Sequence, residues 1–436
     1  MKEDMILHYK KWRKTRKMSK KGWKRILAGT LSAVMVLGLC ACGGAKGGKG
    51  DKTVVTLAFW NDETTMRPLL DLCAEKLPDI EVQYNFTANT NYGVTQRTQI
   101  LSGSGDDIVA LSLDFSEGML EQGLFEDLTD LVGDNFTFAP EDYVDGKIYY
   151  VPMATWYEGI YYNKDLFEKH NIELPKTYDE LLDVCDKFTE LGIKPYAIGA
   201  GTASTLLKHM LGYVQAEYML EEEGKEFNRK FAKGEAKMAD CLTPYVQEWS
   251  EIAKRGHINS LHLGMDENQA PDEFVTGMAA MWSSGTWSYN SIKQKNPNLN
   301  FGLMPYLGST PEKTSVVGSY GGVFTLNGNS KNKEAARRVL EVIASKEGQE
   351  ALCQGERGSG SLRKDVEMDL PEEFEAVRAT VEAGRWMCAW NFWPSGVFHT
   401  MSQTMQTIVS NPGAVNIKSE LAKVDAQVEK QLQATE

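Results

Sequence analysis

The order of strand-like and helix-like segments predicts an α/β protein, and the length of the chain after residue 51 predicts two domains. Three segments have strand composition and the two between them have apolar side chains at helical spacing: strands at 54–59, 80–86 and 107–112, helices at 65–77 and 92–101. This β-α-β-α-β order implies a parallel sheet with helices packed on its faces. Residues 52–436 would fill two domains of roughly 100–200 residues each.

A second α/β region begins near residue 160. Thr177 and Glu180 form a capping box at the start of a helix, and Gly192 is placed to end that helix after an apolar stripe. Farther along the chain, Ser330 is expected to cap a helix that continues to Ala344. The alternation of strands and helices therefore extends over most of the chain.

The first 41 residues have the pattern of a secretory signal peptide. Residues 2–25 contain 11 Lys or Arg against two acidic residues, and residues 26–41 contain no charge. This apolar run is shorter than the roughly 20 residues that cross a bilayer as a helix, which favours a cleaved signal over a permanent anchor.

The end of this leader, Leu39-Cys40-Ala41-Cys42, resembles a bacterial lipobox, with a leucine three residues before the cysteine and a small residue directly before it. Cleavage there would leave Cys42 as a lipidated N-terminus. The alternative is a secreted protein with an incidental cysteine, and Met18 is a second possible start of the leader.

Composition narrows the class of partner. Residues 42–52 are rich in glycine and lysine without an apolar group to bury, so they are expected to form a flexible tether. Removal of the leader leaves 36 Lys and Arg against 58 Asp and Glu, a formal charge of −22. Such a surface repels phosphate backbones, which excludes a nucleic-acid partner and disfavours a strongly anionic ligand.

Motifs for metal or cofactor chemistry are missing from the sequence. It contains no H-E-x-x-H, no C-x-x-C, no phosphate-binding G-x-x-x-x-G-K-[ST] and no nucleophile elbow, so neither a metal nor a cofactor is expected. The cysteines beyond Cys42 are odd in number and far apart, which favours free buried thiols, with one disulfide as the alternative: Cys73, Cys185, Cys241, Cys353 and Cys388.

Several segments in a fixed order resemble a known family. The most specific is Asp145–Phe188, and the supporting segments are Gly105–Ile108, Gly123–Leu128, Phe274–Trp282 with Gly285–Trp287, and Gly321–Leu326 running into Ser330–Ala336. Together they resemble the extracellular sugar-binding lipoproteins of bacterial ATP-driven importers, sugar-binding family 1, which share the bilobal periplasmic-binding-protein fold of maltose-binding protein. The resemblance extends over nearly all of the chain after the tether.

The resemblance implies two α/β lobes joined by crossing segments, with the ligand in a hinged cleft. Lobe one would comprise residues 52–155 and 321–363, and lobe two residues 156–320 and 364–436. It further implies a monomer, lipid-anchored on the extracytoplasmic face of the cell membrane, that closes around a carbohydrate and presents it to the permease subunits of an ABC importer.

The candidate ligand platforms are tryptophans, because a sugar offers flat C–H faces to aromatic rings. Trp60 follows the first strand, Trp156 lies on a proposed crossing segment, and Trp287 matches the family's Gly-x-Trp position. Trp249 and Trp282 are expected in the core. Trp386 and Trp390, with Trp393, fit either one helix face or an irregular loop lining the cleft.

The rim of sugar hydroxyls needs directional polar partners. The candidates are carboxylates and amides near the strand ends and crossing segments, one arginine, and a glycine turn that lets backbone approach the ligand: Asn61, Glu63, Asp114, Glu158, Arg385, Tyr320 and Gly321. A turn that needs a positive φ would explain the glycines equally well.

Two rival classes of protein remain open from the sequence. Glu63 and Glu158 could be the acid/base pair of a secreted glycosidase, and a surface adhesin could share the fold. The expected ligand of the binding protein is a neutral oligosaccharide, since candidate cations near the aromatic residues are few.

Overall fold

The computed structural model describes residues 52–87, 89–111, 119, 122–138, 143–266, 269–320, 322–356, 359–367, 370–394 and 396–435. The predicted signal peptide, the lipidation site Cys42 and the tether up to residue 51 lie outside the described residues, as do Asp114 and Gly321. Within the described ranges, no helix has the length and apolar character needed to cross a bilayer.

The first sheet has five strands in the order β2-β1-β3-β11-β4. Its strands are β1 (Thr53–Phe59), β2 (Ile80–Phe86), β3 (Ile108–Leu111), β4 (Tyr150–Pro152) and β11 (Val323–Leu326). β1 runs parallel to both β2 and β3, as the β-α-β-α-β order predicts, whereas β11 is antiparallel to β3 and β4. The sheet is therefore a parallel core with a strand that returns from much later in the chain.

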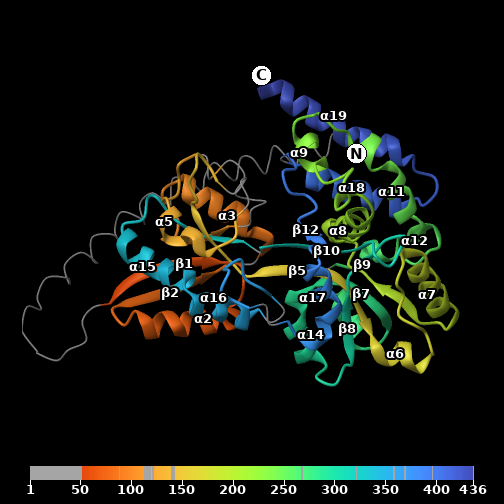
Figure 1. Cartoon of the computed structure of the whole chain (residues 1–436), viewed down its shortest axis with the longest axis horizontal. Coiled ribbons are helices and arrows are strands. Elements are labelled where there is room, and N and C mark those ends of the chain that lie inside the picture. The colour runs from red at the N-terminus through yellow and green to blue at the C-terminus, as the bar shows by residue number, and fades with distance from the viewer. Residues whose placement is uncertain are drawn as a thin grey trace, which may run out of the picture. The chain divides into compact units, whose positions relative to one another are not determined.

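Helices cover both faces of this sheet, with α2 on one side and α3 on the other (Figure 1). They are α2 (Glu63–Lys76), α3 (Asn89–Leu101), α5 (Thr129–Val132), the 3₁₀ turn η2 (Gly133–Asn135), α15 (Lys333–Ala344) and α16 (Lys346–Gly355). The Asp62 carboxylate caps α2 by accepting from the backbone N–H of Thr65 at 2.8 Å. On the α3 side, Tyr92 Oη donates to the carbonyls of Ala58 and Ala110, which ties the helix to two strands.

The second sheet has the strand order β12-β10-β5-β7-β6, with β8 paired to β5 and β9 to β10. Its strands are β5 (Thr155–Asn163), β6 (Lys194–Ala197), β7 (Ala279–Gly285), β8 (Phe301–Met304), β9 (Tyr306–Leu307), β10 (Thr314–Tyr320) and β12 (Trp386–Met387). β5 is antiparallel to β7, β8 and β10. This long strand pairs with three other strands of the sheet and begins three residues after β4 ends.

Many short helices surround the second sheet, and α8, α18 and α19 group together in Figure 1. They are α6 (Lys164–Lys169), α7 (Tyr178–Glu190), α8 (Ala203–Val214), the π-helical turn η4 (Gln215–Met219), α9 (Phe227–Ala232), α10 (Met238–Cys241), α11 (Thr243–Trp249), α12 (Glu251–Lys254), η5 (His262–Gly264), α13 (Ala270–Val275), η6 (Thr286–Ser288), α14 (Tyr289–Lys295), η7 (Glu372–Phe374), α17 (Glu375–Glu382), α18 (Val397–Ser410) and α19 (Ile417–Thr435).

Two of the predicted helix signals are confirmed and one is wrong. Thr177 Oγ1 caps α7 by accepting from Glu180 N at 3.2 Å, although the Glu180 carboxylate accepts from Lys176 N rather than from the cap residue itself. Gly192 follows α7 with φ of +72°, a conformation that glycine adopts without steric cost. Ser330 does not cap α15, which begins at Lys333. Its hydroxyl instead donates to the Asp107 carboxylate at 2.6 Å.

The buried apolar residues form separate clusters on the two sheets. One cluster takes its members from Val55 to Ala154 and from Val323 to Leu352. The others take theirs from Tyr157 to Val317 and from Leu370 to Val428. The thiols of Cys73, Cys185, Cys241 and Cys353 are free. Cys73 and Cys185 are buried, which confirms the favoured interpretation for these two, whereas Cys241 and Cys353 are only partly buried.

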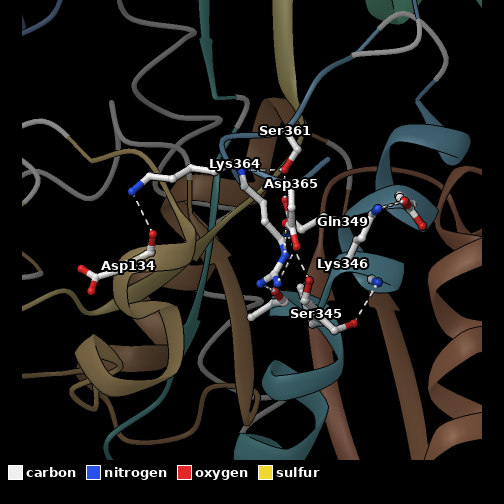
Figure 2. A network of polar contacts seen from close by, with 12 residues as sticks. Asp134, Ser345, Lys346, Gln349, Ser361, Lys364 and Asp365 are labelled. Carbon is white, nitrogen blue, oxygen red and sulfur yellow. Dashed lines mark hydrogen bonds and ion pairs between the residues drawn. The ribbon is translucent and has the colours of Figure 1, made fainter. Parts of the chain in front are cut away.

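Hydrogen bonds hold two of the segments that connect the sheets next to each other, and Figure 2 shows part of this network around Gln349 and Ser361. The buried Gln349 donates to the carbonyl of Pro152 at 3.0 Å and accepts from Ser361 Oγ at 2.6 Å. Thr155 N donates to the carbonyl of Gly360 at 2.7 Å, and Gly360 N donates back to Thr155 Oγ1. The connection after β4 and the one after α16 therefore lie side by side.

Candidate functional site

Three tryptophans that are distant in sequence meet on the second sheet. Trp156 comes from β5, Trp287 from η6 and Trp390 from the turns between β12 and α18. The Trp156 ring stacks on Trp390 with centroids 6.0 Å apart and meets Trp287 edge-on at 5.7 Å. Trp287 is 45% exposed, while Trp390 is buried. We call these three residues the tryptophan platform.

An ion pair lies at the centre of the platform. Lys208 Nζ is 5.5 Å from the Trp156 ring centroid, 5.4 Å from that of Trp287 and 5.7 Å from that of Trp390. The same ammonium is 2.7 Å from Glu158 Oε1. The Glu158 side chain is only 4% exposed, and that of Lys208 26%. Aromatic faces attract a cation, so the rings and the carboxylate together fix the ammonium in place.

Strand pairing explains how β5 supplies two of these groups. Trp156 is in register with Ser319 of β10, and Glu158 is in register with Val317 of β10 and Gly285 of β7. Residues two apart on a strand share a face, so Trp156 and Glu158 project to the same side of the sheet.

The Gly-x-Trp motif has a steric reason. A Cβ at Gly285 would collide with the Trp287 ring, so the glycine lets this ring lie against the end of β7. The residue between them, Thr286, is buried, and its hydroxyl accepts from Tyr157 N at 3.3 Å. The motif therefore orients an exposed ring on a rigid support.

The residues around Trp386 and Trp393 form an irregular segment, one of the two alternatives considered. Trp386 meets Tyr157 edge-on at 5.6 Å, and Trp393 Nε1 donates to the buried Asn228 Oδ1. The segment therefore brings Trp390 to the platform and anchors the other two tryptophans elsewhere. Trp249 and Trp282 are buried, which confirms the expectation that they belong to the core.

Arg385 is engaged within its own lobe. Its guanidinium donates to the carbonyls of Thr314 and Ala216 and forms an ion pair with Glu221 at 3.1 Å. These contacts tie β10 to η4. They give Arg385 a structural role, and none of them joins it to the tryptophan platform.

The candidates of the first sheet lie at the carboxyl end of β1. The half-buried Trp60 ring meets Phe59 and Tyr92 edge-on at 4.6 and 5.2 Å. Asn61 donates through Nδ2 to Glu356, and its carbonyl accepts from Tyr84 Oη at 2.6 Å. Burial raises the pKa of the Glu356 carboxyl, and the hydrogen bond from Asn61 opposes that rise.

Glu63 and Phe86 are both exposed near this end of the sheet. Glu63 lies in the first turn of α2 and pairs with Arg67 one turn later. Phe86 ends β2 in register with Phe59 and is 55% exposed. Phe86 is not among the residues expected from the sequence, although an aromatic residue at the carboxyl end of a parallel strand is a usable signal.

Gly322, which follows β10 and Gly321, has a steric role that the sequence did not indicate. Gly322 lacks a positive φ, and a Cβ there would lie 2.6 Å from the Trp60 ring and 2.8 Å from the carbonyl oxygen of Leu111. Gly322 therefore makes room for Trp60. Tyr320 pairs through its backbone with Thr155, at the start of the strand that carries Trp156.

Lys208 is the main residue that sequence reasoning missed. It is the only fully charged side chain in the apolar helix α8, between Leu207 and His209. A single lysine in such an apolar helix is a sequence feature that could have indicated a site residue. A hollow of about 550 Å³ between α11, α12 and the α18–α19 connection is lined by none of the predicted site residues. No cluster of metal-ligating side chains occurs in the described ranges.

The protein has two sheets, each covered by helices and with its own apolar core, and two of the connections between them lie side by side. This is the architecture of a bilobal solute-binding protein. Residues 61–350 match the family described as bacterial extracellular solute-binding protein, and the chain belongs to this family. Its members bind solutes outside the cytoplasm. The chain is therefore a binding protein rather than an enzyme, and the glycosidase alternative is not retained.

Relatives in sequence are similar over most of their length. The multiple sugar-binding protein of Streptococcus mutans serotype c is 24% identical over 339 residues, which cover 74% of this chain and 79% of the relative. The galactooligosaccharide-binding protein of Bacillus subtilis is 24% identical over 375 residues, which cover 81% and 85%.

Solved structures show the same fold. A family 1 extracellular solute-binding protein from Bifidobacterium longum subsp. infantis has a TM-score of 0.70 at 23% identity, with 87% of this chain and 100% of that chain covered. The solute-binding protein RafE in complex with raffinose has a TM-score of 0.73 at 20% identity, with the same coverage.

Proposed function

We propose that the protein captures a neutral oligosaccharide and delivers it to the permease of an ABC importer. The observation that carries the proposal is the tryptophan platform, whose exposed Trp287 ring offers a flat apolar face beside polar groups. Such a surface suits the C–H faces and hydroxyl rim of a sugar. The names of the two sequence relatives, a multiple sugar-binding and a galactooligosaccharide-binding protein, support a carbohydrate.

The charge of the site supports a neutral ligand. Lys208 is the cation on the platform, and Glu158 compensates it at 2.7 Å. The remaining groups of the platform are apolar rings. An anionic sugar that approached Lys208 would therefore also meet the Glu158 carboxylate, on a chain whose mature form is strongly acidic.

The ligand would be held between two lobes, residues 52–155 with 321–363 and residues 156–320 with 364–436. Lobe two supplies the tryptophan platform and Glu158. Lobe one supplies Trp60, Asn61 and the exposed carboxylate of Glu63, with Asp114 and Gly321 as further candidates. Tyr320, at the end of segment 156–320 of lobe two, is another candidate near the crossing segments. A ligand that contacts both lobes favours the closed state through those contacts, and the paired connections around Gln349 are a suitable hinge.

The protein would act as a monomer anchored at the membrane surface. The lipobox resemblance supports signal cleavage before Cys42 and attachment of a lipid to it, and the glycine-rich segment 42–52 supports a tether that keeps the binding lobes close to the permease.

A thermal-shift screen of the purified protein against neutral and acidic mono- and oligosaccharides tests the proposal. A ligand at 100 times its Kd adds about 2.7 kcal/mol to the free energy of unfolding, which gives a visible shift of the melting temperature. Trp287→Ala should abolish the shift without unfolding the protein, because this ring is half exposed.

Tyr143→Ala is the matched control, since Tyr143 is 44% exposed and has no contact with the platform. It should retain the shift. A response only to peptides, polyamines or other non-carbohydrate solutes would keep the family and refute the carbohydrate ligand.

A further inference from the structure

We propose that Phe392 is a positioning residue of the tryptophan platform: its left-handed backbone, held by helix α9, keeps Trp390 stacked on Trp156. The inference rests on the proposed function in taking the platform as the saccharide site. It goes further by naming a residue outside the platform that sets the geometry of the rings, and by assigning a role to the irregular segment between β12 and α18.

The backbone of Phe392 is in an unusual conformation. Its φ is +67°, in the left-handed region. The other non-glycine residues with positive φ in the described ranges are Asp145 and Asn171, whose short polar side chains tolerate this region. For a residue with a larger side chain, the clash of its Cβ with the backbone lowers the population of this conformation by about fivefold to thirtyfold. Phe392 therefore needs contacts that hold it there.

Helix α9 supplies these contacts. The Arg229 guanidinium lies over the Phe392 ring, 5.2 Å from its centroid, and this attraction offsets the cost of the left-handed backbone. The preceding residue on the helix, the buried Asn228, donates to the carbonyl of Ala389 at 3.2 Å and accepts from Trp393 Nε1 at 2.9 Å. α9 therefore fixes the chain at residues 389, 392 and 393.

Phe392 lies between two rings that contact different elements. Trp393 N donates to the carbonyl of Trp390 at 3.2 Å, which closes a four-residue turn with Phe392 in its third position. The Trp393 ring meets Phe231 of α9 edge-on. The Trp390 ring instead stacks on Trp156 of β5, at an interplanar angle of 18°. A change of φ at Phe392 to a negative value would rotate one ring relative to the other, so the two contacts together depend on the left-handed residue.

Two substitutions separate the backbone of Phe392 from its ring. Phe392→Ala and Phe392→Gly both remove the ring and its contact with Arg229, but only glycine adopts a φ of +67° without steric cost. The turn in Phe392→Ala should therefore relax toward negative φ and release Trp390 from Trp156. In Phe392→Gly the turn should keep its conformation, because no steric cost remains to be offset.

Fluorine NMR of the purified protein labelled with 5-fluorotryptophan measures this geometry without any ligand. The resonance of Trp390 is assigned as the one that disappears in Trp390→Phe, and its position depends on the ring current of the stacked Trp156. This resonance should move by more than its linewidth in Phe392→Ala and should stay at its wild-type position in Phe392→Gly.

Calorimetry with cellotriose, xylotriose and galactotriose gives the functional readout. The dissociation constant of the saccharide that the wild-type protein binds most tightly should rise about fivefold or more in Phe392→Ala and change by less than about twofold in Phe392→Gly. Asn171→Ala is the matched control, since it places an alanine at a φ of +52° at an exposed position after α6. It should lower the melting temperature but leave the Trp390 resonance and the dissociation constant unchanged.

Three results would overturn the proposal: a Trp390 resonance or a dissociation constant that Phe392→Ala leaves unchanged, equal changes in Phe392→Ala and Phe392→Gly, or a displacement in Asn171→Ala as large as that in Phe392→Ala. If Phe392→Ala fails to fold, Phe392→Gly decides alone, since a displaced resonance there overturns the proposal and an undisplaced one supports it. Wild-type protein that binds no saccharide would refute the proposed function instead, and the fluorine spectra would still decide the role of Phe392.

Discussion

His209 follows Lys208 on α8 and is fully enclosed beneath the second sheet, so acid should weaken the lobe that carries the tryptophan platform. Trp249 Nε1 donates to His209 Nδ1 at 2.8 Å, and His209 Nε2 lies 3.3 Å from Tyr196 Oη. The ring is therefore neutral, with Nδ1 as an acceptor. Burial lowers the pKa of His209 from 6.5 to about 3.

The sign and size of the effect follow from this lowered pKa. The unfolded chain takes up a proton below pH 6.5, whereas the folded chain resists protonation down to about pH 3. The contribution to stability is therefore complete above pH 6.5 and is lost as the pH falls between these values. At pH 5 the loss is about 2 kcal/mol relative to pH 8.

Urea unfolding at pH 8 and pH 5, followed by tryptophan fluorescence, measures this loss. His209→Asn is the comparison, because its amide oxygen can accept from Trp249 but cannot titrate. The variant should be less stable at both pH values, yet lose about 2 kcal/mol less than the wild-type protein on acidification. Equal losses in the two proteins would refute the inference that His209 is held neutral.

The remaining predictions concern the support of Trp60 and the membrane anchor. Gly322→Ala should cost about 1–3 kcal/mol of unfolding free energy in urea titrations and weaken saccharide binding, because its Cβ would lie 2.6 Å from the Trp60 ring. Gly264→Ala, where the new Cβ meets no atom within 4 Å, should change neither quantity, and equal effects of the two would contradict the steric argument. Cys42→Ser should move the protein from the membrane fraction to the medium and abolish labelling with a palmitate analogue, whereas Cys40→Ser should do neither; label retained by Cys42→Ser would disprove the assigned site.

Local patterns predicted elements in both lobes. Strand and helix periodicities are short-range properties, so the alternation from β1 to β3 could be predicted, as could the cap at Thr177 and the end of α7 at Gly192. The core positions of Trp249 and Trp282 followed from the same patterns. The family could also be predicted from the sequence, because its characteristic segments keep their order along the chain.

The start of α15 could not be predicted from the local sequence. Ser330 has the composition of a helix cap, but its hydroxyl binds Asp107, which is 223 residues away in sequence. Asp107 also accepts from the backbone N–H of Thr56, so one buried carboxylate organises three distant segments. The local pattern of a helix cap cannot reveal that a distant carboxylate binds the same hydroxyl.

By itself, the sequence determined the class of fold, the order of its elements and most of the side chains that meet at the platform. Only the tertiary structure decided which of them meet. Trp156, Trp287 and Trp390 converge because β7, which η6 follows, pairs with β5, and β12 belongs to the same sheet through β10. Lys208 joins them from α8. Glu158 and Lys208 are 50 residues apart. Their pairing depends on strand register and helix packing, which are set by burial across the whole lobe rather than by any local pattern.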